Sequence, residues 1–321
     1  MTALLYDRSA LGKLVLTGPD APGFLHNIST NDIKPMPLGA GCETFFCDAR
    51  AKALYFAVVY HVRFAGKNAL WLETVPGAVE GLQKHLDKFL IAEQVEIHDV
   101  TADYAQFHLA GPEAPAILER ALADTLLALP EFYHMERTFG ATATANIRRH
   151  EPLGLSGYDI VCRTKFADGI HAMLVDAGAA VGTPEQYETH RIEAGTPTPG
   201  IDFDAARFVM EIGRAARAVY YQKGCFPGQE PIVMARDRTG RINRSFLRLS
   251  VEGDEALPVG TKLTAGETDA GVITSSALSP RLGSIAVGYV GWKFVEAGTM
   301  LTTPNGLKVT VVGPPTEAHV S

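Results

Sequence analysis

The sequence predicts a multi-domain protein of mixed helices and strands that ends in a small domain made of strands alone. Its 321 residues exceed what one hydrophobic core normally carries, because domains usually span roughly 100–200 residues. Apolar residues make up 46% of the chain and charged residues 20%, which is typical of packed globular proteins and excludes general disorder. Helix-like and strand-like patterns alternate in the first 244 residues, and only strand-like patterns follow.

The first lobe begins with a strand over 13–18 that a glycine closes. Asp20 then stands at the N-cap of a helix that has Pro22 in its first turn. Apolar residues at helical spacing predict an amphipathic helix over 76–91. Further strands are expected at 42–47, 53–60 and 70–73.

A second set of similar units predicts a second lobe. Helices are expected from 111 to about 128 and over about 169–180. Thr183 and Gln186 form a capping box at the start of the next helix, and Gly195 closes that helix. Strands are expected at 104–109 and 158–163.

The pattern of apolar residues changes after residue 244, where helix-like spacing ends. Short alternating runs are separated by glycine and proline turns, which predicts a β-barrel or sandwich of about 70 residues. We therefore expect a region of residues 1–244, divided into two lobes near 100–110 and not necessarily continuous in sequence, and a C-terminal barrel of residues 245–316. The expected strands of the barrel include 245–251, 270–275, 284–290 and 307–312.

Charge and cysteine content narrow the class of protein. A net charge of −7 disfavours a protein that mainly grips nucleic-acid backbone. The longest apolar run, 53–60, falls far short of the roughly 20 residues of a membrane-spanning helix, and Asp7 and Arg8 interrupt any secretion signal. Four cysteines without a Cys-x-x-Cys pair predict neither a disulfide scaffold nor a zinc site. We expect a reduced, cytoplasmic protein without a membrane segment or a metal site.

The segment 223–230 has the most unusual local sequence, Lys-Gly-Cys-Phe-Pro-Gly-Gln-Glu. Its two glycines and its proline favour a tight turn and allow the backbone to approach a ligand closely. The ammonium of Lys223 would lower the pKa of the nearby Cys225 thiol and stabilise a reactive thiolate. The alternative is that Cys225 is a small buried apolar residue in a structural turn, as most free cysteines are inert.

This octapeptide resembles the signature of the YgfZ-type folate-binding proteins. These are relatives of the glycine-cleavage T-protein, the tetrahydrofolate-dependent aminomethyltransferase. The resemblance extends over about residues 20–290, because three further stretches that the superfamily shares occur in the same order. They are Phe24-Leu25 with Thr30-Asn31-Asp32, Arg191 to Gly195 with Pro197, Gly200 and Asp202, and Thr274 to Val290.

The resemblance implies an α+β fold in which two ferredoxin-like lobes and a C-terminal β-barrel form a three-part ring around a central channel. The channel would hold tetrahydrofolate or a one-carbon-substituted folate. A pterin edge needs a buried carboxylate as hydrogen-bond acceptor, a role that matches Asp159, and Arg191 matches the family arginine near the folate. The alternatives are a surface acid at a strand end for Asp159, and a solvated helix residue paired with Glu188 or Glu193 for Arg191. The folate-binding candidates are Tyr158, Asp159, Arg191, Gly228, Gln229, Glu230 and Arg236.

Two departures from the family pattern bear on the reaction. T-proteins carry an aspartate on the second strand of the first lobe, and Tyr55 and Phe56 stand at that place here. A phenol with a pKa of about 10 cannot replace a carboxylate at neutral pH, so aminomethyl transfer is not expected. Pro231 interrupts the run after the octapeptide, so a strand continuing from Glu230 would lie at an edge or be bulged, and the position of Arg236 is in doubt.

The resemblance implies a tetrahydrofolate-binding accessory protein that supports assembly or repair of iron–sulfur enzymes, including tRNA-modifying ones. In this hypothesis Cys225, with Lys223 beside it, is an exposed thiolate at the mouth of the folate channel. A first alternative is a folate-dependent aminomethyltransferase or demethylase that uses a rearranged carboxylate such as Asp32 or Asp48. A second is a scaffold that has lost folate binding. The expected partners are folate and iron–sulfur client proteins, and the chain is expected to be a monomer.

Basic and histidine side chains offer further candidates. Five arginines within 236–248 could hold a folate polyglutamate tail or RNA phosphates, or could form a solvated hairpin that pairs with Asp237 and Glu252. Apart from Phe246, no aromatic residue is interleaved with them, so direct RNA binding is not expected. The histidines show no metal-ligand spacing, and His134 and His150 are expected at the surface. The five arginines are Arg236, Arg238, Arg241, Arg244 and Arg248.

Overall fold

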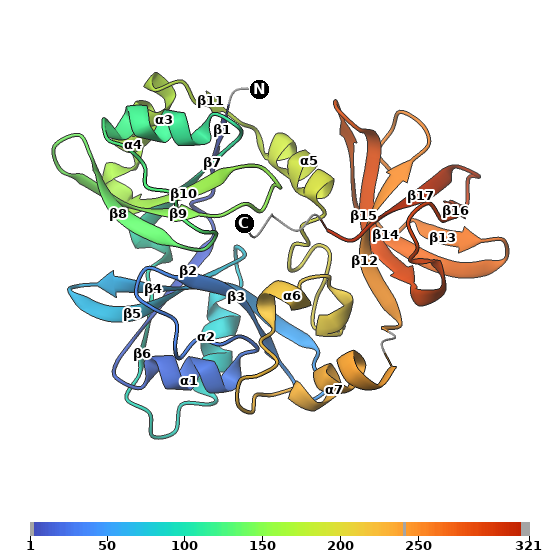
Figure 1. The fold of residues 1–321 in the computed structure, drawn as a ribbon, viewed down its shortest axis with the longest axis horizontal. Helices are drawn as coiled ribbons and strands as arrows, with labels where there is room; N and C mark the ends of the chain where they lie inside the picture. Colours follow the sequence, from blue (N-terminus) through green and yellow to red (C-terminus); the bar gives the residue numbers. More distant parts are fainter. Residues whose placement is uncertain (1–2, 240–241, 316–321) are drawn as a thin grey trace.

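The computed structural model describes residues 3–239 and 242–315, which fold into three parts that meet at the centre of the molecule (Figure 1). Two lobes of mixed helices and strands lie one above the other, and a strand-rich part stands beside them. This arrangement confirms the expected fold class. Within the described ranges, no helix has the length and apolar character needed to cross a bilayer. The predicted end of the barrel at residue 316 lies outside the described residues.

The first lobe is a five-stranded sheet with the order β3-β4-β5-β2-β6. Helices α1 (Ala21–Ile28) and α2 (Val79–Asp87) cover one face and bury an apolar cluster that includes Leu14, Phe46 and Leu82. The strands are β2 (Gly12–Thr17), β3 (Gly41–Cys47), β4 (Ala53–Phe64), β5 (Lys67–Thr74) and β6 (Glu96–Asp99).

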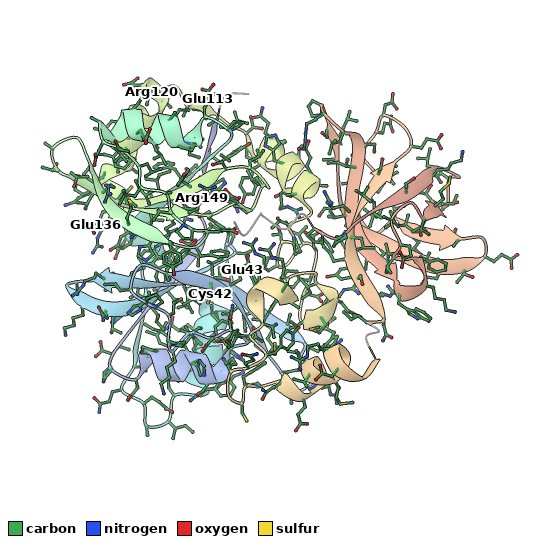
Figure 2. The ribbon with its side chains drawn as sticks, in the orientation of Figure 1. Cys42, Glu43, Glu113, Arg120, Glu136 and Arg149 are labelled. Carbon is green, nitrogen blue, oxygen red and sulfur yellow. The ribbon has the colours of Figure 1, made fainter. Side chains whose placement is uncertain are left out.

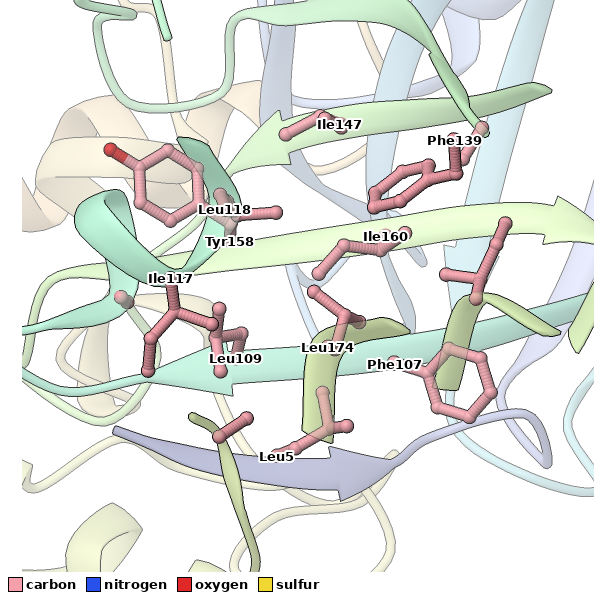
Figure 3. Close-up of a cluster of buried hydrophobic side chains, with 14 of the residues drawn as sticks. Leu5, Phe107, Leu109, Ile117, Leu118, Phe139, Ile147, Tyr158, Ile160 and Leu174 are labelled. Carbon is pink, nitrogen blue, oxygen red and sulfur yellow. The ribbon is translucent and has the colours of Figure 1, made fainter. Parts of the chain in front are cut away.

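The second lobe is a six-stranded sheet with the order β11-β1-β7-β10-β9-β8, so the N-terminal strand β1 pairs with β7 rather than with the first lobe. Helices α3 (Ala114–Leu122) and α4 (Ala167–Asp176) cover its outer face, where Phe107, Ile160 and Leu174 pack together (Figure 3). The strands are β1 (Leu4–Asp7), β7 (Tyr104–Ala110), β8 (His134–Phe139), β9 (Ala143–Arg149), β10 (Gly157–Arg163) and β11 (Ala180–Val181).

The C-terminal part is a closed six-stranded barrel, which decides between the expected barrel and sandwich. Leu249, Leu263 and Ile273 lie in its apolar interior. Helix α5 (Pro184–Ala194) contacts the barrel strands β14 and β15 and connects the second lobe to the barrel. The strands are β12 (Arg244–Val251), β13 (Lys262–Ala265), β14 (Thr268–Ser279), β15 (Gly283–Gly291), β16 (Met300–Thr302) and β17 (Lys308–Gly313).

Most helices and strands lie where the sequence predicts them, but some predicted elements differ in length and one differs in type. The capping box forms as predicted, because Gln186 N donates to Thr183 Oγ1 and Thr183 N donates to Gln186 Oε1. The expected helices over 76–91 and 111–128 are shorter, because α2 ends at Asp87 and α3 at Leu122. The expected strand after Glu230 is wrong: α7 (Gln229–Met234) occupies that segment, and Pro231 is tolerated in its first turn because no intrahelical N–H bond is needed there. Two short helical segments, Val209–Glu211 and α6 (Ala215–Ala218), precede it.

Candidate functional site

The inner faces of the two sheets face each other, and the layer between them is unusually polar. Side chains alternate across a strand, so the residues of β10 that follow the core residues Tyr158 and Ile160 point inward. The register of β3, β4, β5 and β2 sets Glu43, Val58, Glu73 and Lys13 in one row on the inner face of the first sheet. On the second sheet the facing row consists of Tyr6, His108, Asp159, Arg148 and His134.

Buried ion pairs hold this layer together. Arg148 and Glu73 are 1% and 5% exposed, and they form a salt bridge between the two lobes. Gln106 Nε2 donates to the other oxygen of Glu73 at 3.1 Å. A carboxylate without such partners could not stay charged at this depth, so the pairing is what permits the charges.

Glu43 forms the second buried pair. Its carboxylate accepts from Arg214 Nε at 3.0 Å and from a second nitrogen of the same guanidinium, and Arg217 Nε lies 3.5 Å away. Burial alone would raise the pKa of Glu43, but the two arginines outweigh burial and hold that pKa below its usual value. Figure 2 shows Glu43 near the centre of the molecule, where the two lobes meet.

A cavity of about 120 Å³ opens beside these pairs, and we call it the inner cavity. An outer cavity of about 440 Å³ adjoins it and shares Arg8, Val75, Tyr187 and the segment around Pro199. The inner cavity is lined by Arg8, Leu11, Glu43, Phe56, Val58, Glu73, Thr74, Val75, His150, Pro152, Tyr187, Thr196, Pro197, Thr198, Pro199 and Arg214. Apolar walls with a few convergent polar groups are typical of small-molecule sites.

Asp159 lies one residue behind this wall. It is 3% exposed, and its two oxygens each accept a hydrogen bond of 2.8 Å, one from His108 Nδ1 and one from His150 Nδ1. Burial would raise the pKa of Asp159, but the two histidines hold it well below its usual value. Burial would lower the pKa of His150, but Asp159, Glu131 and Glu73 outweigh burial and raise it. Asp159 is therefore a buried acid that contacts the cavity through His150, and the alternative of a surface acid is excluded.

Arg191 joins α5 to the barrel. It is 2% exposed, it donates to Asp202 Oδ2 at 2.7 Å and to Ser275 Oγ at 3.0 Å, and it also pairs with Glu188. The alternative of a solvated residue is excluded, although its predicted pairing with Glu188 is present. Because Arg191 lines the outer cavity, it could contact a ligand there.

The remaining second-lobe candidate, Tyr158, lies in the apolar core, and its hydroxyl accepts a hydrogen bond from Arg149 at 3.0 Å.

The octapeptide lies apart from both cavities, since no residue from 223 to 230 lines either of them. Cys225 is exposed. Lys223 is buried, and its Nζ donates to the carbonyl oxygens of Ser29 and Asn31, at 2.6 and 2.7 Å, and to that of His26. Cys225 is exposed as expected but lines neither cavity, and Lys223 anchors the turn to α1 and to the residues that follow it.

The second half of the octapeptide starts α7. Gly228 has a φ of +83° at the N-cap, and a Cβ there would lie 2.8 Å from the carbonyl oxygen of Asp48, so only glycine fits. Gln229 and Glu230 form the first turn of α7, away from the cavities. Arg236 follows the helix, is exposed and pairs with Asp237.

Among the described arginine side chains of the run, none forms an ion pair with Glu252. Arg244 lies 3.7 Å from Asp269, and Arg248 Nε donates to the carbonyl oxygen of Pro314 at 2.9 Å. Two of the predicted members, the side chain of Arg238 and the whole of Arg241, lie outside the described residues.

The two residues at the expected T-protein acid position point to opposite faces of β4. Phe56 lines the inner cavity, whereas Tyr55 faces the helix side, where its ring packs against His85 with centroids 5.4 Å apart. The other carboxylates considered for that role, Asp32 and Asp48, line neither cavity. Asp32 lies 3.2 Å from His26, and Asp48 accepts backbone hydrogen bonds within its own turn.

Several residues of the site were missed by the sequence analysis. His150 and His134 do not lie free at the surface: the side chain of His150 is 16% exposed and lines the inner cavity, and His134 Nε2 lies 3.0 Å from the carbonyl oxygen of His61 in the other lobe. Glu43 lies two residues before the apolar run Phe45-Phe46-Cys47, and Glu73 directly follows the apolar run 69–72. A charged residue so close to a buried run is a signal that could have identified them.

Comparisons with known proteins agree with this geometry. The family model described as "GCVT N-terminal domain" matches residues 1–223. The chain is 27% identical over 287 residues to the aminomethyltransferase of Rubrobacter xylanophilus, covering 89% of this chain and 75% of that protein. It is 28% identical over 305 residues to the aminomethyltransferase of Saccharopolyspora erythraea, covering 92% and 81%. The fold resembles the crystal structure of the glycine cleavage system aminomethyltransferase T from Bartonella henselae, with a TM-score of 0.84 and 21% identity over 99% of this chain and 87% of that one.

Proposed function

The chain belongs to the GCVT N-terminal domain family, and on that premise we propose that it binds a reduced folate in the inner and outer cavities. The relatives named above are aminomethyltransferases. Tetrahydrofolate is the cofactor that this family relationship implies. We further propose that the protein is an accessory factor in the assembly or repair of iron–sulfur enzymes, including tRNA-modifying ones, as its octapeptide suggests.

The observation that carries the folate proposal is a cation beside the two adjoining cavities that has no ion-pair partner among the described residues. Arg8 lines both cavities, its guanidinium lies 4.0 Å from the centre of the Tyr187 ring, and it forms no ion pair within residues 3–239 and 242–315. Such a group suits the carboxylates of a folate glutamate tail. Arg191, also at the outer cavity, already has carboxylate partners.

In this proposal the inner cavity receives the pterin ring, and its lining offers the groups that such a ring would contact. Glu43 and Glu73 supply carboxylate oxygens as hydrogen-bond acceptors, and Phe56 and Tyr187 supply aromatic surface. When bound, tetrahydrofolate would supply nitrogen atoms that can carry a one-carbon unit. The residues of this chain would hold and orient the ring, and Asp159 would act on it through His150 rather than directly.

The cavity does not favour aminomethyl transfer. Both carboxylates that line the inner cavity are held by arginines, and the cavity-facing residue of β4 nearest the expected acid position is Phe56. A general base must be within hydrogen-bond reach of the proton that it removes and must have a suitable pKa, whereas Glu43 has a lowered one. We therefore propose folate binding without turnover of an aminomethyl donor.

The accessory role is supported by the YgfZ-type octapeptide and by the exposure of Cys225. The turn that carries this thiol is anchored through Lys223, so the thiol has a fixed place on the surface. In this proposal the client protein or its cluster is the substrate that meets Cys225, and folate binds at a separate site. The two halves of the proposal can therefore be tested independently.

Calorimetric titration with tetrahydrofolate under anaerobic conditions tests the binding site. Wild-type protein should bind, and Arg8→Met should bind at least about tenfold more weakly, because a charge-assisted hydrogen bond is lost. Arg236→Met is the matched control, since it removes an exposed arginine away from both cavities. Absence of binding by the wild type, or equal weakening by the two variants, would contradict the proposal.

Complementation of cells that lack the protein tests the accessory role. Cys225→Ser should fail to restore the activity of iron–sulfur enzymes, whereas Gln222→Ser, an exposed residue of the same turn, should restore it. Both variants should still bind tetrahydrofolate. Full restoration by Cys225→Ser would refute this role of the thiol, and formation of labelled methylenetetrahydrofolate from an aminomethyl donor would favour the transferase alternative.

A further inference from the structure

The second lobe holds a histidine pair that the proposed function does not yet use. Asp159 accepts from the Nδ1 atoms of both His108 and His150, which lie on opposite sides of its carboxylate. Only His150 lines the inner cavity. The side chain of His108 is 2% exposed, and its Nε2 has no hydrogen-bond partner among the described residues.

The carboxylate fixes the tautomer of His150. An ionised carboxylate only accepts hydrogen bonds, so Nδ1 of His150 must carry the hydrogen that Asp159 receives. The atom that changes protonation is therefore Nε2, on the opposite edge of the ring. Among the described residues, the one hydrogen bond of the His150 ring is that of Nδ1 to Asp159, so Nε2 has no partner there. Histidine–carboxylate pairs of this form are used for proton transfer, because the carboxylate orients the ring and stabilises its charged form.

Neighbouring side chains also limit how the ring can move. Phe132 packs against His150 with ring centroids 5.5 Å apart and an interplanar angle of 40°. The ring of His108 lies edge-on to that of His150, with ring centroids 6.3 Å apart. The titratable and charged groups around His150 include its neighbours His108, Asp159 and Glu131 and the inner-cavity residues Glu73, Glu43, Arg214, Arg8 and Tyr187. Of these, the carboxylates of Asp159, Glu131 and Glu73 favour the protonated ring.

We propose that His150 is the proton-exchanging group of the inner cavity, with Asp159 as its positioning residue and a heterocycle that carries a ring carbonyl or ring nitrogen as its ligand. A protonated His150 donates from Nε2 to such an acceptor, and a neutral His150 does not. A pterin belongs to this class, so the inference rests on the proposed function and adds to it the residue and the pH range of recognition.

The first test needs no ligand. The ring protons of His150 are followed by NMR from pH 5 to 9 in protein with labelled histidine, and His150→Gln assigns the signal. We expect a midpoint above about 6.5, the ordinary value for histidine, and Asp159→Asn should move the midpoint of His150 downward. A midpoint at or below about 6.5 would overturn the inference. This measurement uses the wild type, so it stands even if a variant fails to fold.

The second test measures tetrahydrofolate affinity across the same pH range. Wild-type affinity should be about tenfold or more higher below the His150 midpoint than above it, His150→Gln should remove this dependence, and His98→Gln should retain it. A pH dependence that comes from titration of the ligand itself would be the same in all three proteins, so it can be told apart from that of His150. Binding whose pH profile is the same in His150→Gln and in the wild type overturns the inference and leaves the proposed function intact. Absence of binding at every pH overturns the proposed function, and with it the ligand assignment made here.

Discussion

The interior of the C-terminal barrel and the layer between the two lobes are both enclosed by strands, yet they are filled differently. The barrel interior is apolar, with Leu249, Leu263 and Ile273 among its buried residues. The layer between the lobes buries Glu73 and Arg148 at 5% exposure or less. Replacing a buried ion pair by apolar residues often leaves a protein equally or more stable, so stability alone does not account for the charged layer.

We propose that these charges serve ligand binding. Glu43, Glu73 and His150 line the inner cavity, and they share its wall with Phe56 and Val58 from the apolar cluster of the same layer. Preorganised charges in an enclosed site recognise a polar ligand without reorganisation. The comparison therefore shows that this chain can build an apolar core, and it supports the proposal that the polar layer is a binding site.

Removing one partner of the interlobe ion pair should have the largest effect on stability. Arg148→Met should lower the free energy of unfolding by about 3–5 kcal/mol, because Glu73 then stays buried without its cation. Denaturant unfolding at pH 7 measures this. The double variant Glu73→Leu/Arg148→Met is the control and should recover much of the loss. A double variant that is no more stable than the single one would contradict this account of the charges.

A cavity-forming change in the barrel should cost somewhat less and should respond differently to pH. Leu263 is fully buried, so Leu263→Ala should lower the free energy of unfolding by about 3 kcal/mol through lost burial and an unfilled volume. Since no charge is involved, this loss should be equal at pH 5 and pH 8. Denaturant curves at both pH values measure this loss. A loss that clearly depends on pH would contradict the account of the barrel interior as free of charge effects.

His150 should add a pH-dependent part to stability. Its pKa in the folded protein is raised above about 6.5, so its contribution is fully present below pH 6.5 and is lost as the pH rises through the folded pKa. The stability difference between wild type and His150→Gln should therefore shrink between pH 6 and pH 9, by about 1.4 kcal/mol per unit of pKa shift. A constant difference across this range would show that Asp159 does not favour the charged ring.

The exposed turn should tolerate substitution best. Cys225→Ser should change the free energy of unfolding by less than about 0.5 kcal/mol, because the side chain is exposed. Lys223→Met in the same turn is the contrasting variant, since it leaves three carbonyl groups without their donor. Thermal unfolding of both variants checks this, and a large loss for Cys225→Ser would mean that the thiol supports the fold.

Short-range sequence patterns predicted the helices and strands, whereas the site depends on which strands pair and so bring distant residues together. The capping box at Thr183, the glycine that closes α5 and the alternating strands of the barrel are short-range patterns, and each appears where it was expected. His150 escaped prediction because its significance comes from Asp159, which reaches it only through the pairing of β10 with β9. Arg8 escaped because it becomes a cavity residue only once β1 joins the second lobe.

A crystal structure of the protein with 5-formyltetrahydrofolate tests the central claim most directly. We expect the pterin ring in the inner cavity beside Glu43 and His150, and the glutamate carboxylates beside Arg8 in the outer cavity. An ordered ligand elsewhere on the molecule, with the layer between the lobes free of it, would contradict the assignment of that layer as the binding site.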